Sequence, residues 1–123
     1  MSTLVPQTIN LYAGEAHTLN AAITKNGVVV NITTGHIFSF EAKRTLSQPV
    51  PDISAMSAGA GAAIVITNGI GGLAEIRLTA AHTAWATEYG GRASITMTWD
   101  LWDSATPEPI ATGSLVLWRL PQS

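Results

Sequence analysis

The sequence predicts an all-β fold, a two-layer antiparallel sandwich of seven or eight short strands with one short helical turn. Three observations lead to this prediction. Apolar and polar residues alternate with a period of two along most of the chain. Glycine, asparagine and proline interrupt the alternation at regular spacing. The length of 123 residues suits a single domain, which can bury about two-thirds of its unfolded surface.

Alternation in the first half of the chain predicts four strands. They lie around Ile9 and Leu11, and over residues 17–24, 28–32 and 36–44. Asn26-Gly27 predicts a tight hairpin turn between the second and third strands, because both residues tolerate a positive φ angle. The core face of the fourth strand is expected to carry Phe38, Phe40 and Ala42.

Residues 47–62 break the alternation with two prolines and many Gly, Ala and Ser residues. A loop of this length in a small domain is usually functional or disordered. We therefore predict a long flexible loop at 47–62 and an N-terminal arm at 1–8, both suited to reaching a neighbouring molecule. The single domain is expected to span residues 9–120.

The second half predicts four more strands, at residues 63–67, 73–78, 92–102 and 110–120. Thr79 is a good helix N-cap, which predicts a short helical turn through Ala86 that Trp85 would anchor against the sandwich. The last strand is apolar on both faces, which indicates that both of its faces are covered.

The charge of the chain is low and nearly balanced. Charged residues make up 11% of the sequence, against about 25% in a typical soluble domain, and the net charge is −2. This is not the footprint of a nucleic-acid-binding protein. A free monomer generally carries more charge, so this low content of charged residues favours a protein whose surface is covered by a partner. The alternative is a monomer with a surface rich in Thr and Ser. No apolar run reaches the ~20 residues that span a bilayer, and no secretion signal is recognisable.

No combination of residues predicts catalysis, a cofactor or a metal site. The chain has no cysteine, and His17, His36 and His82 fall in different predicted elements. Asp100 is expected to point outward from a strand, and Asp103 to begin a turn by bonding its own backbone. We therefore expect a protein that is not an enzyme and binds no cofactor.

Large apolar side chains near strand ends and in the predicted loop are the candidate interface residues. Exposed aromatic side chains mark protein interfaces, although the same residues could instead pack beneath loops. The candidates are Tyr12, Pro49, Pro51, Ile53, Met56, Trp102 and Trp118.

Seven short motifs occur in a characteristic order: Ile9–Glu15, Asn26-Gly27, Val30–Gly35, Phe38–Arg44, Gly72–Thr79, Tyr89–Gly91 and Gly113–Leu117. In this order they resemble the small immunoglobulin-like domains of tailed-phage virions, such as the N-terminal domain of baseplate upper proteins. One departure is Asn31, where the family has an acidic residue. The resemblance implies an immunoglobulin-like sandwich with a structural role in a bacteriophage particle.

The resemblance also implies partners and a location. Because the sequence ends three residues after Leu120, a stand-alone copy would suit a capsid decoration or cement protein that stabilises neighbouring shell subunits. Its partners would be the major capsid protein or, as the alternative, tail or baseplate proteins, and it would form a homo-oligomer within the particle. It would reside in the virion after synthesis in the host bacterial cytoplasm, and neither nucleic acid nor membrane is expected as a partner. A carbohydrate-binding module that uses Trp102 or Trp118 as a sugar platform is a further interpretation.

Overall fold

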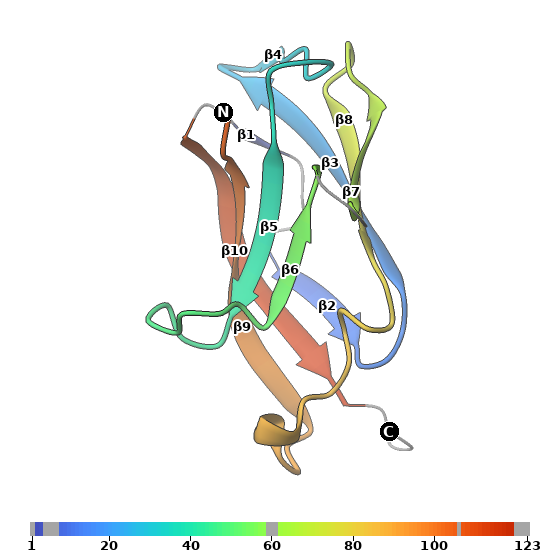
Figure 1. Ribbon diagram of the computed structural model, residues 1–123, viewed down its shortest axis with the longest axis vertical. Helices are drawn as coiled ribbons and strands as arrows, with labels where there is room; N and C mark the ends of the chain where they lie inside the picture. Colours follow the sequence, from blue (N-terminus) through green and yellow to red (C-terminus); the bar gives the residue numbers. More distant parts are fainter. Residues whose placement is uncertain (1, 4–7, 59–61, 106, 120–123) are drawn as a thin grey trace.

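The computed structural model describes residues 2–3, 8–58, 62–105 and 107–119, and it confirms the all-β prediction (Figure 1). The described residues form ten strands and one short 3-10 helix, joined by turns and irregular connections. The elements are β1 (Ser2–Thr3), β2 (Thr8–Tyr12), β3 (His17–Lys25), β4 (Val28–Val29), β5 (Phe38–Lys43), β6 (Ile53–Met56), β7 (Ile64–Asn68), β8 (Leu73–Leu78), η1 (Thr87–Tyr89), β9 (Ser94–Asp103) and β10 (Glu108–Trp118).

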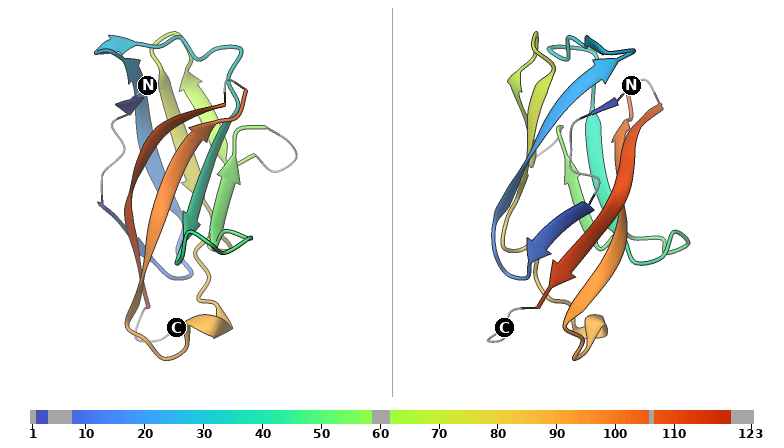
Figure 2. Two further views of the ribbon diagram at one scale, coloured as in Figure 1. Left: turned by 90° about the vertical axis from the view of Figure 1, so that its left-hand side faces the viewer. Right: turned by 180° about the vertical axis from the view of Figure 1, so that it is seen from behind.

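Two sheets form the layers of the sandwich. One has the strand order β1-β3-β8-β7, with β4 paired to β3, and is called the β3 sheet. The other has the order β2-β10-β9-β5-β6 and is called the β9 sheet. Neighbouring strands are antiparallel except β2 and β10, which run in the same direction at one edge (Figure 2, right). This parallel pair arises because the chain crosses from the β3 sheet at β1 to the β9 sheet at β2.

The core lies between the two sheets, where the predicted inward faces meet. Phe38, Phe40 and Ala42 of β5 are fully buried, as predicted, and the Phe40 ring stacks on Trp99 of β9 with 5.7 Å between centroids. Burying such a side chain contributes about 1.5–3 kcal/mol, so this aromatic centre stabilises the β9 sheet in particular. The Trp99 indole N–H has no hydrogen-bond partner within the part of the chain that the structure describes.

The prediction of a continuous loop at 47–62 is wrong for residues 53–56. Residues 53–56 form β6, which pairs with β5 and extends the β9 sheet by one strand. Only two apolar residues, Ile53 and Met56, mark this four-residue strand among Ala and Ser, which is too short a pattern to separate from a loop. In the predicted arm, Ser2 and Thr3 pair with β3 as β1, while residues 1 and 4–7 lie outside the described residues.

The predicted helical turn lies further along the chain than expected. Residues 80–83 form only turns, and the 3-10 helix is at Thr87–Tyr89. The Thr79 N–H donates to the His82 ring at 2.9 Å, and the Thr83 hydroxyl donates to the Glu15 carbonyl at 2.7 Å. These bonds hold the segment in turns. Trp85 packs against the core, as predicted.

The other turns follow the sequence closely. Asn26 and Gly27 have φ angles of 53° and 77°, which confirms the predicted hairpin turn. The strand after it is shorter than expected and covers only Val28–Val29. The Val30 N–H still donates to the Ile23 carbonyl of β3, and beyond it the Ile32 N–H donates to the Gly69 carbonyl in the turn between β7 and β8.

Candidate binding surface on the outer face of the β9 sheet

The outer face of the β9 sheet carries most of the predicted interface residues. The strand register places Tyr12 of β2 beside Trp118 of β10 at one end of the face. At the other end, Met56 of β6 and Trp102 of β9 lie on either side of Ser39 of β5. The four large side chains are each 39–44% exposed. Four candidates that are scattered in the sequence therefore lie on one face, at its two ends.

The remaining three candidates lie elsewhere. Ile53 is only 2% exposed, so its prediction as an interface residue is wrong: β6 turns it inward with the core side chains. Pro49 is exposed and Pro51 is half-buried in the connection between β5 and β6. Leu46 and Val50 in the same connection are more exposed than Tyr12, Met56 and the two tryptophans, yet they carry no periodic signal that could have identified them.

At the first end, Tyr12 and Trp118 are direct partners in the register of β2 and β10. The Trp118 Nε1–H donates to the Asn10 Oδ1 at 3.1 Å. The Tyr12 ring stacks on the His17 ring with centroids 6.1 Å apart, and the Tyr12 backbone N–H donates to His17 Nε2 at 3.0 Å. Trp118 remains 41% exposed, so the prediction that both faces of β10 are covered is wrong within this chain.

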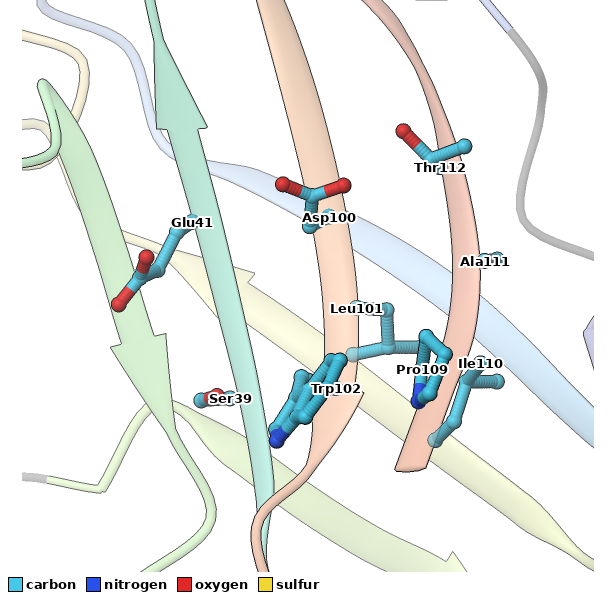
Figure 3. A pocket seen from close by; sticks show the side chains of 9 residues that line it. All are labelled: Ser39, Glu41, Asp100, Leu101, Trp102, Pro109, Ile110, Ala111 and Thr112. Atoms are coloured by element: carbon cyan, nitrogen blue, oxygen red, sulfur yellow. The ribbon is translucent and has the colours of Figure 1, made fainter. Parts of the chain in front are cut away.

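At the second end, the face is hollowed into a groove of about 670 Å³, here called the indole groove (Figure 3). The β10 strand bulges between Pro109 and Ala111 beside it, and a bulge bends a strand locally. The Trp102 indole lies between Ser39 and Pro109 and lines the groove. The volume is in the range of small-ligand sites. The lining residues are Ser39, Glu41, Asp100, Leu101, Trp102, Pro109, Ile110, Ala111 and Thr112.

Two residues with carboxylate side chains line the indole groove together with Trp102. Glu41 and Asp100 are direct partners in the register of β5 and β9. Neither side chain forms a hydrogen bond or an ion pair with another described residue. Like charges placed directly opposite each other across two strands destabilise a sheet. Asp100 points outward, as the sequence predicted, but sequence reasoning missed Glu41 because alternation does not reveal the register between strands.

Asp103 fixes the end of β9 that presents Trp102. Its side chain is fully buried and accepts hydrogen bonds from His36 Nδ1–H at 2.6 Å, Ile37 N–H at 3.2 Å and Ala105 N–H at 3.1 Å. The bond from Ala105 confirms the predicted turn chemistry. The pairing with His36 joins residues 67 positions apart and has no signal in the sequence.

A cluster of aromatic rings and arginines lies where the segment after β8 meets the connection between β5 and β6. Arg119 lies over the Trp85 ring at 5.9 Å, Trp85 packs edge-on against Tyr89 at 5.3 Å, and Arg44 lies over Tyr89 at 5.0 Å. Burial raises the pKa of Tyr89 to about 12, helped by the Asp52 carboxylate and opposed by Arg44. A hydrogen bond to Asp52 raises the pKa of Arg44. This cluster holds the two connections together.

The described residues show neither a candidate metal site nor a membrane-spanning helix. Among them, no three His, Asp or Glu side chains gather closely enough to hold a metal ion. No helix in the described part of the chain is long and apolar enough to cross a membrane. The expectation that the protein is not an enzyme remains a prediction.

Comparison with known proteins supports the fold. No protein-family model matches the chain, and no curated protein matches its sequence significantly. Among solved structures, the NK cell receptor Nkp44, described as a triggering partner in natural cytotoxicity, superposes with a TM-score of 0.50. The match covers 93% of this chain and 97% of the receptor chain at 9% sequence identity. At that identity the likeness concerns the fold alone, and the chain is an all-β, immunoglobulin-like sandwich, as predicted.

Proposed function

We propose that this protein is a non-catalytic binding domain that attaches to another protein through the outer face of the β9 sheet. The observation that carries the proposal is the placement of four large, half-exposed apolar side chains on that one face, Tyr12 and Trp118 at one end and Met56 and Trp102 at the other. Aromatic side chains and Met are enriched at protein interfaces, where they supply most of the binding energy.

Much of the area between the two ends is polar and uncharged, and Glu41, Lys43 and Asp100 supply the charges on this face. The exposed side chains of the uncharged part are hydroxyls and one amide, which can lose water at a lower cost than charged groups. Interface centres are depleted of charge in the same way. These residues are Thr8, Asn10, Thr96, Thr98, Thr112 and Ser114.

We further propose that the binding partner is a structural protein of a bacteriophage particle. Two features support this: the order of motifs that resembles immunoglobulin-like virion domains, and the low charge of the chain. In the favoured form, the protein decorates the capsid and clamps neighbouring copies of the major capsid protein. A tail or baseplate adaptor is the alternative. Many copies on one shell would add avidity to an interface of about 800 Å² per partner.

Particles assembled without this protein provide the test. Purified protein is added, and bound copies per particle are counted by quantitative mass spectrometry. Hundreds of copies favour a capsid role, and about a dozen favour a tail or baseplate role, by the symmetry of such assemblies. The double variant Trp102→Ser/Trp118→Ser is expected to lose at least about tenfold in affinity.

The matched control is Ile70→Ser/Leu73→Ser, which removes exposed apolar side chains from the turn and strand of the β3 sheet. This control is expected to bind as the wild type does. Circular dichroism confirms that both variants are folded. Absence of wild-type binding to any particle component, or equal losses in the two double variants, would contradict the proposal.

A further inference from the structure

We infer that the indole groove binds a cationic side chain of the partner, with the guanidinium group of an arginine as the best fit. This inference rests on the proposed function and adds the chemistry that the partner presents at one end of the binding face. It concerns Trp102, Glu41 and Asp100, which line the groove together.

The indole supplies the first half of the site. Trp102 is 39% exposed, lies along the groove and has Pro109 as its direct neighbour across the β9–β10 ladder. The face of an indole ring is the best of the aromatic surfaces for attracting a cation. A planar guanidinium can stack on that ring and still direct its N–H groups to the side.

The carboxylates supply the second half. Glu41 is half-buried and directly opposite Asp100, and neither has a partner among the described residues. Lys43 is the next residue on the same face of β5, but it lies opposite Thr98 and forms no ion pair with described residues. Two neighbouring negative charges that form no ion pair with described residues repel each other, and an incoming cation would relieve this repulsion while forming charge-assisted hydrogen bonds.

The same charges argue against other ligands. A neutral sugar could lie on the indole, but it would leave the repulsion between Glu41 and Asp100 in place. An anionic group would add to that repulsion. The other end of the face lacks this combination, since the direct ladder neighbours of Trp118 are Tyr12 and Ser94. The arginine site is therefore expected at Trp102 and not at Trp118.

Two short peptides test the inference. One is acetyl-Gly-Val-Arg-Val-Gly-amide, and the other carries citrulline, an uncharged isostere, in place of arginine. Binding to the full chain is followed by NMR through the indole N–H signals. We expect the arginine peptide to shift the Trp102 signal and not that of Trp118, and the citrulline peptide to bind at least about tenfold more weakly.

Variants of the two carboxylates separate charge from shape. Glu41→Gln/Asp100→Asn keeps the volume of the groove and is expected to bind the arginine peptide at least about tenfold more weakly than the wild type. The control, Glu15→Gln/Glu88→Gln, removes two exposed carboxylates, one from the connection between β2 and β3 and one from η1, and should leave binding unchanged. Raising the salt concentration should weaken the binding of the arginine peptide alone.

The inference is overturned if the two peptides bind equally, if the arginine peptide leaves Trp102 unshifted up to its solubility limit, or if the two carboxylate variants behave alike. A Trp102 shift produced by maltotriose and not by the arginine peptide would also overturn it, in favour of a glycan site. In each of these cases, retained particle binding by the wild type and its loss in Trp102→Ser/Trp118→Ser would leave the proposed function standing.

Discussion

The two ends of the outer face of the β9 sheet carry tryptophans of nearly equal exposure, 39% for Trp102 and 41% for Trp118, in different surroundings. The Trp118 indole N–H is bonded to Asn10, and Tyr12 lies beside it. Trp102 lies in a groove with two carboxylates that have no partner among the described residues. Exposure alone therefore does not define what an aromatic residue binds. The charge around it separates an apolar contact from a site with a chemical preference.

The largest effect is expected from Asp103→Ala at the Trp102 end. The substitution leaves His36 without its partner and removes a buried acceptor of two backbone N–H groups, so it should destabilise the fold by about 3 kcal/mol. Urea unfolding measures this loss. In NMR spectra of the folded variant, the indole N–H signal of Trp102 should shift and that of Trp118 should not, because Asp103 lies at the Trp102 end. Equal shifts of both signals would contradict the distinction between the two ends.

The next effect concerns binding at the two ends. Trp118→Ala and Trp102→Ala are each expected to weaken attachment to the partner by about 2 kcal/mol, as interface hot spots do. Only the part of the affinity contributed by Trp102 should depend on salt, because only that end pairs charges. Binding isotherms of both variants at low and high salt check this, and the same salt dependence in both variants would remove the distinction.

Alkaline pH should destabilise the fold through the cluster around Tyr89. The pKa of Tyr89 is raised to about 12 by burial, above its ordinary value of 10. A raised tyrosine pKa means that the fold favours the neutral form, so its contribution is complete below pH 10 and is lost as the pH rises to about 12. Unfolding free energies measured across this range should fall more steeply for the wild type than for Tyr89→Phe. Parallel curves would contradict the assignment.

The smallest effect is expected from Glu41→Gln alone. Removing one of two opposed carboxylates should raise the unfolding free energy by about 0.2–1 kcal/mol, although the same change should weaken binding of the arginine peptide. Thermal unfolding of the variant beside Glu15→Gln checks the first part. A destabilised Glu41→Gln would mean that the carboxylate already has a favourable role in the unbound fold.

The fold could be predicted from the sequence to a large extent because period-two alternation is a local property. The inward faces around Phe38, Phe40 and Ile76 and the turn at Asn26-Gly27 follow from neighbouring residues alone. Strand β6 could not be predicted, since its four residues lie between Pro51 and an Ala/Gly-rich stretch and show too little contrast. Their strand state is set by pairing with β5, a non-local contact.

The candidate site was predicted only in part, for the same reason. Alternation placed Asp100 on the outer face of its strand, and composition drew attention to the exposed tryptophans. The neighbours that define the groove, Glu41 and the bulge before Ala111, depend on the register between strands distant in sequence. The buried pair of His36 and Asp103 depends on it too. Sequence patterns thus identified candidate residues but not their partners.

Radical footprinting of the four tryptophans, Met56 and Ile70, in the free protein and in the protein bound to partner particles, tests the central claim most directly. Trp102, Trp118 and Met56 should be protected on binding, whereas Ile70 in the turn of the β3 sheet should keep its reactivity and buried Trp99 should be unreactive in both states. Unchanged reactivity of Trp102 and Trp118 in the bound protein would contradict the account, because it would show that another surface holds the partner.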